Sequence, residues 1–291
     1  MKRAFLFPGQ GSQFVGMGKD LYEKYEEVRN IYDLATKISN IDVAKICFEG
    51  PEELLNRTEY TQIAIFTTSL AFLKILTQKN ITADIAVGLS LGEYAALVYG
   101  GILNIEDGLK LITKRGYYME NLCEQNKEYA MAAIMGLNVE IIEQICKEFY
   151  YKGKFVVPAN YNYSGQTVIA TEKEIMDEVI QKLKEHNAKK VVILKTTRPF
   201  HTEKLIKAKQ AYSKELENIN FNLENTKVKV IKNIDGTIYK KTDNLKEILA
   251  NHIISPVRFD KAIKQMQDEN IEEFIEIGPR KDINRFYKKR G

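Results

Sequence analysis

The sequence has no tryptophan, six prolines and three cysteines among its 291 residues. The cysteines, Cys47, Cys123 and Cys146, are odd in number and include no Cys-x-x-Cys pair, which argues against a disulfide framework and a structural zinc site. The sequence also lacks a large excess of one charge sign, because it has 43 basic and 39 acidic residues. The resulting net charge of +4 is too small to indicate nucleic acid as the main partner.

Long hydrophobic runs are scarce. The first apolar segment, residues 4–7, ends at Pro8-Gly9 and is too short for a signal peptide or a membrane span. We expect no later stretch to be long and apolar enough to cross a bilayer. These features favour a cytoplasmic protein with no membrane partner and no bound metal, and we expect a monomer. A composition of 44% hydrophobic and 28% charged residues still supports a sizeable hydrophobic core.

Short predicted strands alternate with helices along most of the chain. Strands are predicted at residues 4–7, 85–87, 228–232 and 273–277. Helices are predicted at residues 61–79, with Thr61 as the cap, and at 92–99, 104–124, 202–216 and 245–253, followed by a basic helix at the C-terminus. Such alternation is typical of an α/β protein with a largely parallel sheet covered on both faces.

Residues 127–197 follow a different pattern. Strands are predicted at residues 130–135, 155–159, 167–170 and 191–194, with helices at 139–149 and 172–186. Strand–helix–strand–strand–helix–strand is the ferredoxin-like (βαββαβ) order. We therefore predict a ferredoxin-like subdomain at 127–197, inserted into a core formed by residues 1–126 and 198–291.

A serine lies at a predicted strand-to-helix turn. Residues 88–92 (GLSLG) fit the G-x-S-x-G nucleophile elbow, with a strand before and a helix after, as the motif requires. This context weighs against a chance match in a glycine-containing loop. The sharp turn projects the Ser90 oxygen outward, and the start of the helix supplies N–H groups that stabilise negative charge. The amide of Leu91 is thus a candidate donor to an oxyanion.

A serine nucleophile needs a base, usually histidine, and the sequence offers three. His186 ends a charged helix, where a solvated role is the simplest interpretation. His201 follows the stiff segment 198–200 (RPF) and is the better candidate. His252 lies in an apolar segment near a helix end, where packing is its simplest role, and it remains the competitor. No acidic residue stands out as a third member, so a backbone carbonyl is a candidate acceptor for the histidine.

Several short motifs occur in order along essentially the whole chain: residues 7–13 (FPGQGSQ), 60–62 (YTQ), 88–94 (GLSLGEY), 115–119 (RGYYM), 159–162 (ANYN) with 165–166 (GQ), 199–201 (PFH) and 255–259 (SPVRF). In these motifs the chain resembles the malonyl-CoA:acyl-carrier-protein transacylase family. Each motif alone is modest, and the combination is specific.

The resemblance implies a ping-pong reaction in fatty acid biosynthesis or polyketide synthesis. Ser90, assisted by His201, takes a malonyl group from malonyl-CoA and passes it to the phosphopantetheine thiol of an acidic acyl carrier protein. The resemblance places the oxyanion hole at the amides of Gln10 and Leu91. It assigns Arg115 to the malonyl carboxylate, which a guanidinium binds with two parallel hydrogen bonds.

Further residues are assigned by the same resemblance. Phe200 is implied to exclude an α-methyl branch, and the His252 backbone carbonyl to orient His201. Gln62, Asn160 and Gln166 are implied to line the cleft or support its loops.

The resemblance also implies an α/β-hydrolase-like core with the site in a cleft, and a coenzyme A thioester as substrate without a tightly bound cofactor. Three residues depart from the family pattern: Leu89 replaces a histidine, His252 a glutamine, and Arg280 a glycine.

Other functions remain open at this stage. An editing thioesterase would use the same serine and histidine with water as acceptor, and a trans-acting polyketide synthase acyltransferase would differ only in pathway. A phosphate-binding loop after the first strand is excluded, because Phe14 and Met17 replace the required glycine and lysine. A non-catalytic scaffold would instead bind an acidic carrier protein through surface cations, namely Lys189, Lys190, Lys195, Lys204, Lys207, Lys209, Arg285, Lys288, Lys289 and Arg290.

Overall fold

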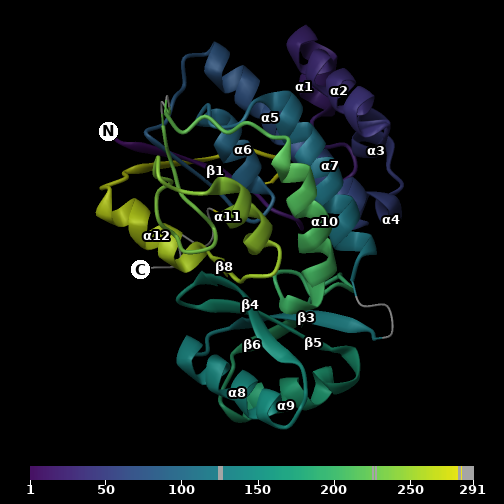
Figure 1. Ribbon diagram of the computed structural model, residues 1–291, viewed down its shortest axis with the longest axis vertical. Coiled ribbons are helices and arrows are strands. Elements are labelled where there is room, and N and C mark those ends of the chain that lie inside the picture. The colour runs from purple at the N-terminus through teal and green to yellow at the C-terminus, as the bar shows by residue number, and fades with distance from the viewer. Residues whose placement is uncertain (124–126, 225, 227, 281–282, 284–291) are drawn as a thin grey trace.

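The computed structural model describes residues 1–123, 127–224, 226, 228–280 and 283, which contain two sheets (Figure 1). The first sheet is parallel throughout. Its strand order is β7 (Lys229–Val230), β2 (Ile85–Gly88), β1 (Arg3–Phe7) and β9 (Glu273–Glu276). The strands predicted around these positions are confirmed, although β7 is shorter than the predicted 228–232.

The strand β1 is apolar because it is buried on both faces. Phe5 and Phe7 belong to the larger hydrophobic cluster, whereas Ala4 and Leu6 belong to a cluster on the opposite face. Side chains alternate between the faces of a strand, so a strand covered on both sides needs an apolar residue at every position. This requirement accounts for the uninterrupted run that opens the sequence.

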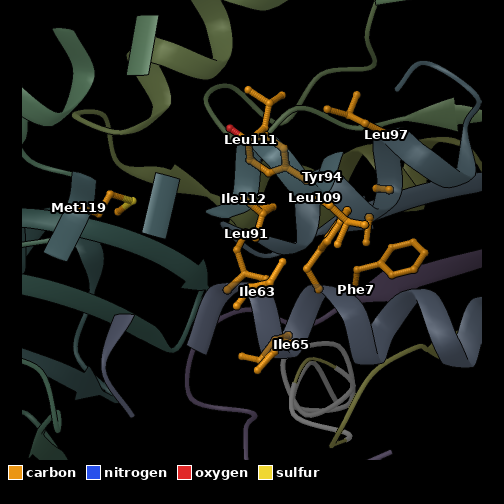
Figure 2. Packing of buried hydrophobic residues seen from close by; sticks show 14 of the residues in the cluster. Phe7, Ile63, Ile65, Leu91, Tyr94, Leu97, Leu109, Leu111, Ile112 and Met119 are labelled. Atoms are coloured by element: carbon orange, nitrogen blue, oxygen red, sulfur yellow. The ribbon is translucent and has the colours of Figure 1, made fainter. Parts of the chain in front are cut away.

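Helices cover both faces of this sheet. The larger cluster contains side chains of α5 (Thr58–Gln78), α6 (Gly92–Tyr99) and α7 (Ile105–Asn121), seen from close by in Figure 2. The opposite face is covered by α12 (Phe259–Asp268), whose buried residues pack against Ala4 and Leu6. The remaining helices of this part are α1 (Lys19–Lys24), α2 (Glu26–Ser39), α3 (Val43–Glu49), α4 (Glu52–Leu55), η2 (Glu203–Leu205), α10 (Ile206–Glu217) and α11 (Leu245–His252).

The helix α5 corrects two expectations. It begins at Thr58 rather than Thr61, and Arg57 is its N-cap residue; the buried Thr61 hydroxyl donates a hydrogen bond to the carbonyl oxygen of Leu55. By length and composition α5 is also apolar enough to cross a membrane, so the expectation that no stretch would be was wrong. Most of its residues are buried inside the protein, where a core helix needs apolar side chains nearly all round.

The second sheet occupies the lower part of Figure 1. Its strand order is β6 (Lys190–Ile193), β3 (Tyr129–Met135), β5 (Gln166–Glu172), β4 (Val156–Tyr163) and β8 (Val257–Arg258). The pairs among β3, β4, β5 and β6 are antiparallel, and β8 joins β4 in parallel. One face packs against α8 (Val139–Tyr151) and α9 (Met176–Glu185), which follows the short turn η1 (Lys173–Ile175).

The opposite face of the second sheet joins the main core. Met131, Ala133 and Val168 belong to the larger cluster, whereas Ala132 and Ile134 face α8 and α9. Because β8 comes from the C-terminal part of the chain, the second sheet is not built from residues 127–197 alone. The predicted C-terminal helix, Lys281 and the four cations from Arg285 to Arg290 lie outside the described residues.

Candidate active site

The sharp turn between β2 and α6 places Ser90 at its apex. Ser90 has a φ of 53°, in the left-handed region that non-glycine residues rarely adopt. The flanking glycines are required by close backbone contacts. A Cβ added at Gly88 would lie 1.9 Å from the carbonyl carbon of Gly92, and one at Gly92 would lie 2.2 Å from the carbonyl oxygen of Phe7. The G-x-S-x-G spacing therefore follows from packing in the turn.

The structure brings Ser90 and His201 together. Ser90 Oγ lies 2.7 Å from His201 Nε2, and His201 Nδ1 lies 2.9 Å from the carbonyl oxygen of His252. Since a carbonyl only accepts, Nδ1 carries the proton and Nε2 is left to accept one from the serine. Burial, followed by the positive charges of His252 and Arg115, holds the pKa of His201 well below its usual range. The imidazole is thus a neutral base near pH 7.

Arg115 lies on α7 with its guanidinium directed at the serine. Nη2 donates to Ser90 Oγ at 3.1 Å, and Nη1 donates to Gln62 Oε1 at 2.8 Å. The side chain is buried, and among the described residues no carboxylate pairs with it and Nε has no hydrogen-bond partner. A buried cation without an anion is unfavourable, so this arrangement is typical of a site that receives an anionic group.

Two backbone amides are available beside the serine. Gln10 and Leu91 both line the cavity, and in the part of the chain that the structure describes neither backbone N–H donates a hydrogen bond. The Gly9 position allows the loop to approach the elbow, because a Cβ there would lie 2.5 Å from the carbonyl oxygen of Leu89. Unpaired amides next to a nucleophile can accept negative charge that develops on a substrate oxygen.

The cavity in front of Ser90 has a volume of about 560 Å³ and lies between the two sheets. Its lining includes Gln62, Leu89 and Phe200 from one side and Asn160 and Gln166 from the second sheet. The cavity therefore brings together every residue that the sequence placed in the cleft except Arg115. Arg115 is not part of the lining, but it donates hydrogen bonds to two lining residues, Gln62 and Ser90.

Two exposed cations line the cavity on different segments. Lys195 follows β6, and Arg280 follows β9 with its guanidinium 5.0 Å from the ring centroid of Phe14. Neither forms an ion pair with a described residue. The departure at Arg280 thus places an unpaired positive charge at the wall of the cavity.

Sequence reasoning missed the polar residues behind the elbow. Asn233 Oδ1 accepts a hydrogen bond from the Ser90 N–H at 2.8 Å, and its Nδ2 donates to the carbonyl oxygen of Gly88 at 2.7 Å. The Tyr239 hydroxyl donates a hydrogen bond to Glu93 Oε1 at 2.8 Å, and both residues are buried. Glu93 had a signal, since it directly follows the elbow motif, but Asn233 lies in a turn with no motif of its own.

Known proteins match the chain over nearly its full length. The model of the acyl transferase domain family matches residues 4–288. A malonyl CoA-acyl carrier protein transacylase of Bacillus subtilis (strain 168) is 36% identical over 288 residues, which cover 99% of this chain and 90% of that protein. This chain belongs to the malonyl-CoA:acyl-carrier-protein transacylase family.

Solved structures of transacylases share the fold. A malonyl CoA-acyl carrier protein transacylase from Clostridium perfringens Atcc 13124 superposes with a TM-score of 0.92 at 36% identity, covering 99% of this chain and 90% of that one. A malonyl-transacylase in complex with a type II polyketide acyl-carrier protein gives 0.93 at 31% identity, covering 99% and 93%. The predicted mixed α/β fold with a parallel sheet is confirmed as that of the transacylase family.

Proposed function

We propose that this protein transfers a malonyl group from malonyl-CoA to the phosphopantetheine thiol of acyl carrier protein through an ester on Ser90. The observation that carries the proposal is the position of Arg115, a buried cation 3.1 Å from the oxygen of a serine that is bonded to histidine. This places a nucleophile and a receptor for a carboxylate in one site. The names of the relatives, which are malonyl transacylases, support the same substrate.

The first half-reaction forms the malonyl-serine ester. His201 Nε2 accepts the Ser90 proton while Oγ attacks the thioester carbonyl carbon. The resulting oxyanion accepts hydrogen bonds from the amides of Gln10 and Leu91, and loss of one such donor typically costs about 10²–10³ in turnover. The carbon–sulfur bond then breaks, and the imidazolium returns its proton to the coenzyme A sulfur.

The second half-reaction reverses these steps with a new thiol. The phosphopantetheine thiol gives its proton to His201 Nε2 and attacks the ester carbonyl carbon. The carbon–oxygen bond to Ser90 breaks, and the imidazolium returns the proton to the serine oxygen. Because malonyl-CoA and the phosphopantetheine thiol enter the same cavity in turn, one serine and one histidine serve both halves.

Arg115 explains the preference for a malonyl group. Nε and Nη2 lie on the same side of the guanidinium and form one of its two-donor forks, whereas Nη1 is already bonded to Gln62. The carboxylate of the substrate would accept from this fork and satisfy the unpartnered Nε. An acetyl or propionyl group leaves the buried charge without an anion and is disfavoured.

We also propose the finer architecture predicted from the sequence. The parallel order β7-β2-β1-β9 with a nucleophile elbow after β2 supports an α/β-hydrolase-like core at residues 1–126 and 198–291. The antiparallel order β6-β3-β5-β4, with α8 and α9 on one face, supports a ferredoxin-like subdomain at 127–197, to which β8 adds an edge strand. No step of the proposed mechanism requires a tightly bound cofactor.

Partition of the malonyl group tests this function against the thioesterase alternative. The enzyme is mixed with malonyl-CoA and holo acyl carrier protein, and malonylated carrier and free malonate are quantified together. We expect most of the malonyl group on the carrier protein. Mainly free malonate would reject the transfer reaction in favour of hydrolysis.

A further inference from the structure

A ring of four hydrogen bonds and one close contact, between Glu93 and His252, links the serine to the histidine through buried residues. The Ser90 N–H donates to Asn233 Oδ1 at 2.8 Å, and the Asn233 N–H donates to Glu93 Oε1 at 3.1 Å. Glu93 Oε2 lies 3.2 Å from His252 Nδ1. The His252 carbonyl accepts from His201 Nδ1 at 2.9 Å, and His201 Nε2 returns to Ser90 Oγ at 2.7 Å. Four chain segments far apart in sequence thus meet in one ring.

Glu93 is the hub of this ring. Its Oε1 accepts from both the Asn233 N–H and the Tyr239 hydroxyl, and its side chain is about as deeply buried as that of His252. Two donors therefore meet at one buried carboxyl oxygen. His252 Nδ1 lies 3.2 Å from the other oxygen of this carboxyl group, and the His252 imidazole stacks on the His201 ring with 4.7 Å between centroids.

The ring acts on the two residues of the site that carry backbone strain. Ser90 has a φ of 53° and His201 a φ of 59°, and neither is a glycine. Left-handed backbone in such residues persists only where the surroundings hold it in place. The ring bonds the Ser90 amide on one side and the His201 imidazole on the other, and so fixes both ends of the proton-transfer bond.

We propose that Glu93 and His252 are positioning residues for the acyl transfer. Through Asn233 and the His252 carbonyl, they hold the Ser90 oxygen and the His201 imidazole at bonding distance. This inference rests on the proposed function, because it concerns the serine and histidine of that reaction. It also gives a role to His252, the residue that stands where the family pattern has a glutamine.

The charge of His252 adds a consequence for pH dependence. Burial lowers the pKa of His201 most, and the positive charges of His252 and Arg115 lower it further. Other ionisable groups around the ring are Glu93, Tyr94, Tyr239 and the buried Lys232, which pairs with Asp243. Removal of the His252 charge raises the pKa of His201, so the acidic limb of the kcat/KM profile moves to higher pH.

Three substitutions separate positioning from general stability. In His252→Leu, Glu93 loses the imidazole that lies 3.2 Å from its Oε2, and we expect kcat to fall about tenfold or more with KM nearly unchanged. Glu93→Gln places an amide among donors and has the same expected effect. In His252→Gln, an amide N–H replaces the imidazole donor, so kcat recovers to within about threefold of wild type. The charge is still missing, so the acidic limb moves upward by about half a unit or more.

The control is His186→Gln, the same change at a histidine on the end of α9 that the site does not use. Its kcat and pH profile should match those of wild type. Thermal unfolding verifies that each variant is folded, and if His252→Leu does not fold, the pH profile of His252→Gln decides alone. Wild-type kcat in both His252→Leu and Glu93→Gln, or an unmoved acidic limb in His252→Gln, would overturn the inference. Absence of malonyl transfer in the wild-type protein would instead refute the proposed function.

Discussion

At the scale of single residues, the site combines a nucleophile, a neutral base and an unpaired buried cation. Ser90, His201 and Arg115 lie on three separate segments, and their side chains meet within hydrogen-bond distance of the serine oxygen. Burial and nearby positive charge keep His201 neutral. The guanidinium of Arg115 has an unpartnered Nε that can bind a negative group. Each of these states has a measurable consequence.

Loss of the cation should change substrate preference. In Arg115→Ala we expect kcat/KM for malonyl-CoA to fall about thirtyfold or more, because a desolvated partner of the carboxylate is removed. The value for acetyl-CoA should fall less or rise. Steady-state kinetics with both thioesters measure the ratio.

Lys114→Ala is the matched control, since Lys114 is the exposed neighbour of Arg115 on α7. Its Nζ lies 3.9 Å from Glu215 Oε1, away from the site. It should leave the malonyl-to-acetyl ratio unchanged. An unchanged ratio in Arg115→Ala would show that the carboxylate is held elsewhere.

The depressed pKa of His201 predicts activity in mild acid. A base must be unprotonated to accept the serine proton, so kcat/KM falls only as the pH drops through the pKa of His201. Since that pKa lies well below its usual range, the profile should stay level through about pH 6.5, the ordinary value for histidine. Measurement of kcat/KM for malonyl-CoA against pH tests this, and an acidic limb centred at or above that value would contradict it.

At the scale of elements, the packing of β1, β2 and α6 creates the elbow. Gly92 is the first residue of α6 and lies against the backbone at the end of β1. No side chain fits there, because even a methyl group would lie 2.2 Å from the Phe7 carbonyl oxygen and 2.8 Å from that of Pro8. The geometry of the serine therefore depends on the fit of three elements.

Substitution of this glycine should affect stability and activity together. We expect Gly92→Ala to lower the free energy of unfolding by about 1–3 kcal/mol through forced backbone shifts. Displacement of the elbow should also lower kcat. Urea denaturation and steady-state assays measure the two effects. A variant with both wild-type stability and wild-type kcat would refute the close packing of the turn.

The elements with strong local signals could be predicted from sequence. The range of α6 was predicted residue for residue, and the helix predicted from residue 104 is α7, for which Asn104 is the N-cap and accepts a hydrogen bond from the Asp107 N–H. The two-residue strands β7 and β8 are too short to show a period, so β7 was overextended and β8 was missed. The helix α2 was also missed, although its buried positions, Val28, Ile31, Tyr32 and Ala35, recur at helical spacing.

The residues of the candidate site also differ in whether the sequence alone could indicate them. Ser90 and Leu91 lie in the elbow motif, which carries its own chemistry, so the sequence indicates them directly, whereas Gln10 was assigned only by the family resemblance. Asn233 is not indicated by the sequence, because its role arises only when the fold brings it to Ser90 from 143 residues away. The charge partner of His252 is likewise invisible in sequence, since the local segment is apolar and the carboxylate comes from α6.

At the scale of the whole molecule, the cavity forms because the second sheet packs against the main core. The loop before α1 and the elbow form one wall, and Met131, Ala133 and Val168 of the second sheet form another. Ligand sites commonly lie at such junctions between parts of a fold. Lys195 follows β6 and Arg280 follows β9, and both residues bring positive charge to the lining of this cavity.

These two cations should strengthen the binding of a substrate that carries phosphates. We expect Lys195→Ala and Arg280→Gly each to raise KM for malonyl-CoA about two- to fivefold, as for exposed charge pairs. Malonyl-pantetheine, which lacks the phosphates, should show no change. Equal effects on both substrates would refute the electrostatic role.

The most direct test of the central claim is the intact mass of the protein after incubation with malonyl-CoA. We expect the wild-type protein to gain one malonyl group and Ser90→Ala to gain none, and we expect holo acyl carrier protein to remove the group from the wild-type protein. A malonyl adduct on Ser90→Ala, or no adduct on a wild-type protein that still transfers malonate, would contradict a serine ester as the intermediate.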